Sequence, residues 1–246
     1  DCDAEQPNSM MFFDAEKVST QSVKLKIPKI DIEKCRFCGK CYDYCNFNSI
    51  FYLPSAKKIH VMEDMCHSCV ACVYACKYRA ISENDISIGE INNYIYQEKY
   101  QIIESQTRVG TYNIVPVIKA ATKLGAKHNL VVLDSPPGTS CPFIQTVREV
   151  DFVILVTEPT PFGVSDLIQS VETLKILGKN YGVIINRSNI GNQQVYDYLK
   201  CENIPLLMEI PYSKEIAKDY SNGDIYVKSN KDLEQQFLLM INKILA

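Results

Sequence analysis

Two short runs of cysteine lie in the first third of this 246-residue sequence and restrict what it can fold into. Both have the spacing C-x2-C-x2-C-x3-C; their members are Cys35, Cys38, Cys41 and Cys45, then Cys66, Cys69, Cys72 and Cys76. The total of 11 cysteines is odd and most are clustered, which disfavours the disulfide framework of a secreted protein. The runs therefore indicate metal-binding thiolates in a reducing cytoplasm.

The same spacing is that of the cysteines that hold cubic iron–sulfur clusters in bacterial ferredoxins, where the fourth cysteine ligates the other cluster. We therefore expect two [4Fe–4S] clusters, cluster one on Cys35, Cys38, Cys41 and Cys76, and cluster two on Cys66, Cys69, Cys72 and Cys45. Zinc is the alternative, but zinc sites usually pair two distant C-x2-C hooks. His60 and His67 lie near the runs; with all eight ligand places filled, they are expected to be surface or structural residues.

Short apolar segments on both sides of the runs predict strands, and together they delimit a small α+β ferredoxin-like domain over residues 29–83. IPKID and KIHVME precede the runs, and NSIFY and RAISE follow them. The usual proline after the fourth cysteine is replaced by Asn46 and Lys77. Positive charge near cluster sulfurs raises reduction potentials. We therefore expect a cluster near Lys77 to have a less negative reduction potential than it would have with the usual proline there. The alternative is a solvated lysine with little effect.

The overall composition excludes several classes of protein. A net charge of -3 and a pI of about 5.7 argue against a general nucleic-acid binder. No apolar run approaches the roughly 20 residues needed to span a bilayer, and no signal-peptide pattern is visible. We therefore expect a cytoplasmic protein that has neither nucleic acid nor membrane as a partner.

Apolar runs of strand length follow the cysteine block, at residues 130–134, 152–157, 181–186 and 206–210. They suit strands buried on both faces of a parallel sheet. A helical pattern at 163–178, stopped by Gly178, separates two of them, and the C-terminal stretch predicts a helix that packs on the sheet. Residues 83–115 are expected to be a connector. The fold class is therefore α/β, a doubly wound, mainly parallel sheet.

Ligands in such sheets bind at the carboxyl ends of the strands. Asp134 ends the first run, at the usual place of a residue that holds a Mg²⁺-bound water in a P-loop NTPase. Gly138 then follows two prolines in a turn whose amide can face a phosphate. Asn186 offers the donor and acceptor that adenine reading requires, and Arg187 and Pro211 stand at the ends of the last two runs.

The sequence resembles the MinD/ParA-type P-loop ATPases of the SIMIBI class, in the branch with an inserted two-cluster ferredoxin. The matching pieces are DCDAEQPN, the eight cysteines, LDSPPGTSCP, VTEPTPFGVSDL, INRSNIG and EIPYSKEIA. The resemblance implies that Asp3 orders the attacking water or Mg²⁺, that Asp134 is the acid on the Mg²⁺ side, and that Gly138 senses the γ-phosphate. It also implies that Asn186 reads adenine. Residues 1–28 and 84–246 would then form the ATPase domain around the insert.

The glycine-rich loop of that family, G-K-G-G-x-G-K-[ST], does not occur in the sequence. Its amides and lysines supply most phosphate binding. We therefore expect this chain alone not to hold ATP tightly, and expect the loop upstream of Asp1. Three cysteines remain, Cys2, Cys141 and Cys201; a small buried thiol is the expected state of Cys141.

Two functional hypotheses follow. The first is an ATPase that couples binding and hydrolysis of MgATP to electron transfer through two [4Fe–4S] clusters. The second is an ATP-dependent factor for assembly or maturation of a metalloenzyme. The expected partners are a redox protein or a metalloenzyme, and a nucleotide-dependent homodimer.

Overall fold

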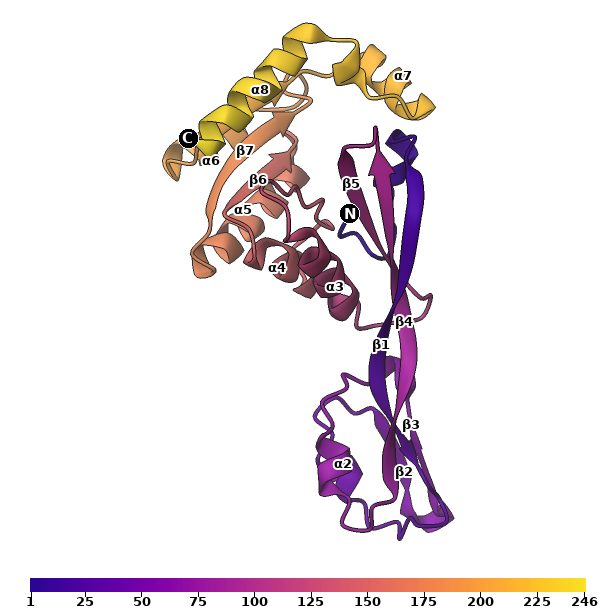
Figure 1. The fold of residues 1–246 in the computed structure, drawn as a ribbon. Helices are drawn as coiled ribbons and strands as arrows, with labels where there is room; N and C mark the ends of the chain where they lie inside the picture. The colour runs from indigo at the N-terminus through magenta and orange to yellow at the C-terminus, as the bar shows by residue number, and fades with distance from the viewer. The chain divides into compact units, whose positions relative to one another are not determined.

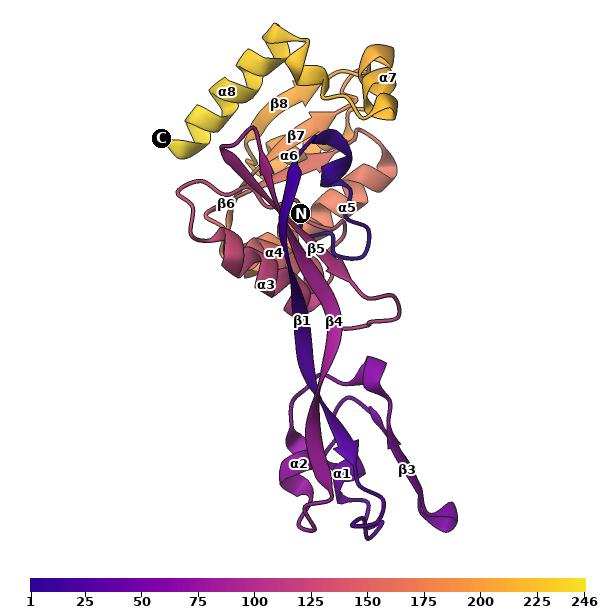
Figure 2. The same ribbon diagram turned by 45° about the vertical axis from the view of Figure 1, so that its right-hand side comes forward.

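The computed structural model describes the whole chain, residues 1–246, which divides into two compact units. Unit one contains Asp1–Asn8 and Ala15–Asp134, and unit two contains Ser9–Asp14 and Ser135–Ala246. Figures 1 and 2 show the elements of each unit. Each unit is described by itself.

Unit one is built on an antiparallel sheet of three strands in the order β1-β4-β5. The strands are β1 (Glu16–Ile30), β4 (Ile81–Tyr96) and β5 (Tyr100–Thr107). In the second half of β1, apolar residues at 23, 25 and 27 alternate with exposed polar residues, which is the period of a half-buried strand. The β1–β4 ladder carries the cysteine loops at one end (Figures 1 and 2).

The cysteine loops contain the strands that the flanking sequences predict. β2 (Ile50–Leu53) pairs antiparallel with β3 (Lys58–Val61), while IPKI and ISEN pair at the end of the β1–β4 ladder. The short helices of the loops are α1 (Lys40–Asp43), η2 (Pro54–Ala56), η3 (Glu63–Met65) and α2 (Ala71–Ala75).

The ladder passes through both expected limits of the inserted domain. Ile27 pairs with Asn84, and Lys29 pairs with Ser82, so hydrogen-bonded sheet continues across the limits 29 and 83. The cysteine loops therefore extend from one end of a longer sheet, whose strands continue beyond the expected limits of the domain.

The expectation that residues 83–115 form a connector is wrong. This segment supplies most of β4 and all of β5, whose ladder runs from Gly89↔Thr107 to Tyr96↔Tyr100. Its strand pattern is hidden by buried polar residues: Asn92 pairs with Glu104 across the ladder and donates to its carboxylate at 3.0 Å. A hydrophobic period cannot reveal such a pair, because the groups satisfy each other only once the strands are aligned.

The strand expected at residues 130–134 is not formed either. The segment runs beside the first residues of the chain, where the Cys2 N–H donates to the Asp134 carbonyl at 2.8 Å. Leu130 and Val132 are 61% and 86% exposed, so the apolar run that predicts a buried strand lies largely at the surface. A helix, α3 (Val115–Gly125), packs on β4 and β5 nearby, and its residues form a core with Cys2, Ile88 and Ile91.

Unit two contains the parallel sheet that the later apolar runs predict. β6 (Phe152–Thr157), β7 (Asn180–Asn186) and β8 (Leu206–Ile210) lie in the order β6-β7-β8, all parallel. Its helices are η1 (Ser9–Phe12), α4 (Cys141–Arg148), α5 (Pro161–Ile176), α6 (Gln194–Cys201), α7 (Lys214–Asn222), η4 (Tyr226–Lys228) and α8 (Lys231–Leu245). The α/β character and a parallel sheet are confirmed. The expectation that the strands are buried on both faces holds for the central strand β7 only, because Ile154 and Val156 of the edge strand β6 are 39% and 64% exposed.

The helices of unit two form two apolar cores with the sheet. Val171 and Leu174 of α5 join Val183 and Ile185 of β7 in the first core. In the second, Met240 of α8 packs with Ile184 and Met208, which confirms the prediction that the C-terminal helix packs on the sheet. None of the helices in the chain has the length and apolar character needed to cross a membrane.

Candidate metal centre

The two cysteine runs have the same backbone path. Positive φ angles occur at equivalent positions of both: 50° at Phe37 and 55° at Ser68, then 76° at Gly39 and 56° at Val70. Left-handed residues at these positions turn the chain sharply. For the β-branched Val70 this conformation is strained, and strain of this kind persists where the surrounding structure imposes it, often at functional sites.

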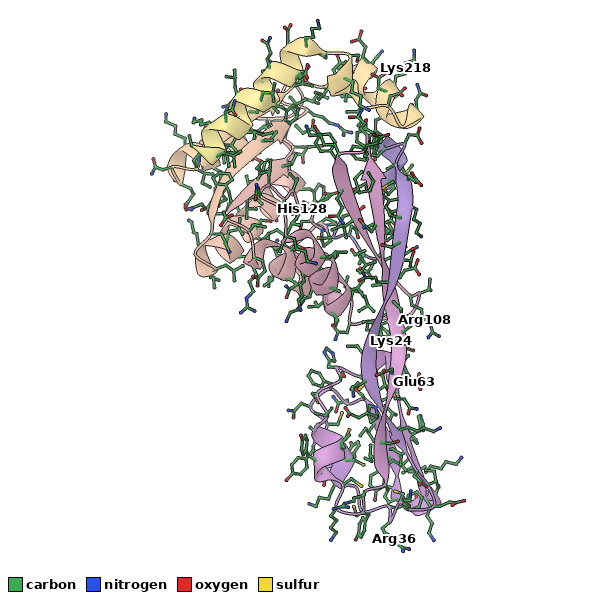
Figure 3. All side chains as sticks on the ribbon, viewed as in Figure 1. Lys24, Arg36, Glu63, Arg108, His128 and Lys218 are labelled. Carbon is green, nitrogen blue, oxygen red and sulfur yellow. The ribbon has the colours of Figure 1, made fainter.

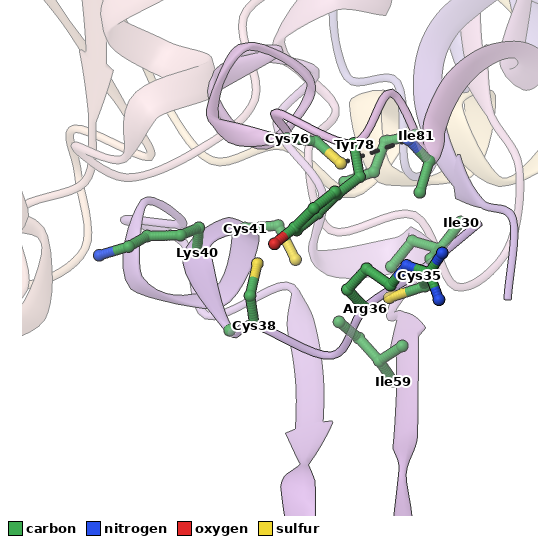
Figure 4. Close-up of a pocket in the computed structure, with 12 residues that line it drawn as sticks. Ile30, Cys35, Arg36, Cys38, Lys40, Cys41, Ile59, Cys76, Tyr78 and Ile81 are labelled. Atoms are coloured by element: carbon green, nitrogen blue, oxygen red, sulfur yellow. Dashed lines mark hydrogen bonds between the residues drawn. The ribbon is translucent and has the colours of Figure 1, made fainter.

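Four thiols line one cavity, which we name site one: Cys35, Cys38 and Cys41 of the first run and Cys76 of the second (Figure 4). Ile30, Ile59 and Ile81 close the cavity with apolar surface, and Tyr78 also lines it. The structure thus brings together the set of thiols expected for cluster one. Their convergence depends on β1 and β4, because these paired strands lead into the first run and out of the second.

Site two consists of Cys66, Cys69, Cys72 and Cys45, the set expected for cluster two. Burial raises the pKa of the Cys66 thiol, and the thiols of Cys69 and Cys45 add to this effect. The Ser49 hydroxyl donates to the Met65 carbonyl at 2.7 Å, so the segment that follows Cys45 lies beside the residue that precedes Cys66. Burial also raises the pKa of Cys72 to about 11. Metal bound at these thiols must therefore displace protons.

Backbone amides donate to the sulfur atoms at matching positions of the two sites. The Phe37 N–H donates to Cys35 Sγ at 3.4 Å, and the Ser68 N–H donates to Cys66 Sγ at 3.5 Å. The fourth cysteines are alike too, since the Ser49 N–H donates to Cys45 Sγ and the Ala80 N–H to Cys76 Sγ, both at 3.3 Å. Such donors stabilise thiolate ligands and tune iron–sulfur clusters.

The donor set fits a cubic cluster. No three His, Cys, Asp or Glu side chains converge closely enough to hold a single metal ion. A [4Fe–4S] cluster instead takes one thiolate on each iron, so thiols spread around a cavity suit it. His60 and His67 are exposed and stack on Phe51 and Phe47, as expected for surface residues.

Sequence reasoning did not identify the other polar side chains of site one. Arg36, Lys40 and Tyr78 line the cavity together with the thiols. Each lies within two residues of a ligand cysteine, which is the signal that could have pointed to them. Lys77, which the sequence did single out, has its Nζ 5.1 Å from the centroid of the Tyr78 ring.

The residues expected to bind nucleotide are divided between the units. Asp3 and Asp134 belong to unit one, where the Asp3 carboxylate accepts from the Gln6 N–H at 3.4 Å. Gly138 belongs to unit two and has a φ of 81°, as a turn after two prolines requires.

The remaining three lie at strand ends of unit two. Asn186 and Arg187 stand at the carboxyl end of β7, and Pro211 follows the end of β8. The Arg187 guanidinium pairs with the Glu158 carboxylate at 3.4 Å, so this carboxylate neutralises part of its charge. Cys141 is exposed as the first residue of α4, and the expectation that it is buried is wrong.

Comparison with known proteins identifies the cysteine region and gives the chain its relatives. Residues 9–80 match the family described as the 4Fe-4S dicluster domain. Uncharacterized protein MJ0579 of Methanocaldococcus jannaschii is 28% identical over 235 residues, which are 94% of this chain and 80% of the relative. Uncharacterized protein MJ0578 of the same organism is 30% identical over 251 residues, covering 99% of this chain and 84% of the relative. The chain carries a 4Fe-4S dicluster domain and belongs to the protein family that includes MJ0578.

Proposed function

We propose that this protein transfers electrons by means of two [4Fe–4S] clusters, one held at site one and one at site two. The observation that carries the proposal is the crossed set of thiols in site one, where Cys76 joins three cysteines of the other run around one cavity. The crossing is the arrangement of two-cluster ferredoxins, in which each run supplies a ligand to the neighbouring cluster.

The residues of the chain have separate roles in this proposal. The thiolates hold the irons, and the four N–H donors stabilise the charge on sulfur. Ile30, Ile59 and Ile81 keep water from one side of site one. When bound, the clusters supply reversible one-electron chemistry.

The test is anaerobic reconstitution of the chain with iron and sulfide. We expect about eight iron and eight sulfide per chain, broad visible absorption that dithionite bleaches, and electron paramagnetic resonance from reduced clusters. Cys201→Ser is the control, because this exposed cysteine lies outside both runs. A chain that instead binds zinc and shows no reducible absorption would overturn the proposal.

Coupling of this redox function to MgATP is a further part of the proposal. It is supported by the parallel sheet of unit two, in which Asn186 and Pro211 stand at the carboxyl ends of adjacent strands. We expect Asp134→Asn, made in the full-length protein with any residues that precede Asp1, to abolish a change in cluster potential caused by MgATP. Potentials that MgATP leaves unchanged in the wild type would remove the coupling.

Assembly of a metalloenzyme is the second candidate, with a metalloenzyme rather than a redox protein as partner. The exposure of Cys38 in site one and of Cys69 in site two favours it, because a cluster held by an exposed thiolate is accessible to an acceptor. Mixing the holoprotein with a chelator or an apo-ferredoxin decides between the two. Rapid loss or transfer of iron supports assembly, and clusters that persist through many reduction cycles support electron transfer.

A further inference from the structure

The two cysteine runs can be compared position by position, because they are copies of one unit. Cys35 corresponds to Cys66, so Arg36 corresponds to His67 and Lys40 to Ala71. After the fourth cysteines, Lys77 corresponds to Asn46 and Arg79 to Asn48. At each of these positions one run carries a cation and the other carries a neutral amide, a methyl group or an imidazole.

The crossing of the fourth cysteine brings three of these cations, Arg36, Lys40 and Lys77, to the same site. Arg36 and Lys40 belong to the first run and line site one, but Figure 4 shows the Lys40 ammonium pointing away from the thiols. Lys77 belongs to the second run, but it follows Cys76, and its ammonium lies 5.1 Å from the ring of Tyr78, which lines the same cavity. The crossing therefore adds a cation of the second run to those of the first.

Site two receives the neutral members of each pair. His67 follows Cys66, and Asn46 follows Cys45. Two exposed carboxylates, Glu63 and Asp64, stand in η3, three and two residues before Cys66. In Figure 3 Arg36 lies at the tip of unit one, whereas Glu63 lies nearer the middle of the β1–β4 ladder.

The ion pairs of the structure show which of these positive charges are offset by a nearby carboxylate. The Asp43 carboxylate lies 3.8 Å from Lys40 Nζ and offsets part of its charge. Arg36 and Lys77 are exposed and take part in none of the ion pairs of the structure. The cationic character of site one therefore rests mainly on these two residues.

The backbone does not account for a difference between the sites. The two N–H donors to sulfur at site one are 3.4 and 3.3 Å from their acceptors, and those at site two are 3.5 and 3.3 Å away. With equal backbone donors, the charged side chains that differ between the sites are the source of a difference in reduction potential on which this inference rests. A nearby positive charge stabilises the reduced cluster, which carries one more negative charge than the oxidised cluster.

We propose that Arg36 and Lys77 make the cluster at site one the more easily reduced of the two. This inference rests on the proposed two-cluster function. It adds that the two clusters have different reduction potentials, the one at site one being the higher. Because both cations are exposed, water and salt screen them, and we expect each to change the reduction equilibrium by roughly threefold.

The experiment exchanges the equivalent residues in the holoprotein and measures reduction by potentiometry with electron paramagnetic resonance. Lys77→Asn and Arg36→Gln should each lower the midpoint potential of the higher-potential reduction wave and leave the other wave unchanged. Asn46→Lys, the matched exchange, should raise the midpoint potential of the lower-potential wave only. Lowering the ionic strength should enlarge all three shifts, since screening weakens. Lys57→Gln, in the turn between β2 and β3, is the control for a change in net charge.

The outcomes separate this inference from the proposed function. If Lys77→Asn and Arg36→Gln shift the lower wave, shift both waves equally, or match the Lys57→Gln control, the inference is overturned while two reducible clusters remain. If the wild type fails to bind about eight irons or shows no reducible clusters, the proposed function itself fails.

Discussion

The two cysteine loops of unit one have nearly the same backbone and quite different side chains. Their left-handed residues fall at equivalent positions, and their N–H donors to sulfur agree within 0.1 Å. Their surroundings differ, because site one has Arg36 and Tyr78 where site two has His67 and Phe47. The comparison separates a backbone path that both loops share from flanking side chains that differ. In our proposals, we assign cluster binding to the shared path and the difference in reduction potential to the side chains.

The largest effect is expected from variants that test whether the fourth cysteine of each run is a ligand at the other site. Cys35→Ser with Cys76→Ser removes two ligands from site one only, so about four irons should remain. Cys35→Ser with Cys45→Ser removes one ligand from each site, so both clusters should be lost or become labile. Iron analysis after anaerobic gel filtration checks both. The opposite pattern, with iron retained only when Cys35 and Cys45 are replaced, would show that each run holds its own cluster.

A smaller effect is expected where the loops differ in a left-handed residue. Gly39 has a φ of 76°, and a Cβ there would lie 2.9 Å from Cε1 of Tyr52. Gly39→Val should therefore lower the free energy of unfolding by about 2 kcal/mol, through backbone strain and displacement of the ring. Guanidinium unfolding under anaerobic conditions measures it. An unchanged midpoint would mean that the first loop does not need glycine.

Different hydrogen bonds tie the two loops to their sheets. The Tyr52 hydroxyl donates to the Phe37 carbonyl in the first loop, and the Ser68 hydroxyl donates to the Lys26 carbonyl at 2.8 Å in the second. Tyr52→Phe and Ser68→Ala should each cost about 1 kcal/mol of stability. Tyr52→Phe should also speed loss of iron from site one, and Ser68→Ala from site two. Equal loss from both sites in either variant would contradict this separation.

The smallest effect is a gain in stability. Val70 occupies, with a φ of 56°, the position of Gly39 in the other run. Val70→Gly should stabilise the holoprotein by about 0.5 kcal/mol, because relief of strain exceeds the greater flexibility of the unfolded chain. The midpoint of the same unfolding experiment measures it. A lower midpoint would show that contacts of the Val70 side chain outweigh its strain.

Local signals were enough to predict the 4Fe-4S dicluster domain around the two cysteine runs and the strands of unit two. The ligands are close in sequence, so their spacing alone indicates an iron–sulfur cluster. β6, β7 and β8 are apolar runs of strand length. β7 is buried on both faces, as expected of a central parallel strand, whereas β6 is buried on one face and its Val156 is 64% exposed. The same reasoning failed at residues 130–134, because an apolar run of strand length forms a strand only where a neighbouring chain offers a ladder of hydrogen bonds.

The sequence by itself determined the spacing of the eight cysteines in the two runs, and through that spacing it predicted which four belong to each site. The tertiary structure decided what surrounds those thiols. Arg36 and Lys77 lie 41 positions apart by residue number, and only the crossing of the runs assigns both to site one. It also decided that the polar residues of β4 and β5 lie inside a sheet, because Asn92 and Glu104 are compatible with burial only when they face each other.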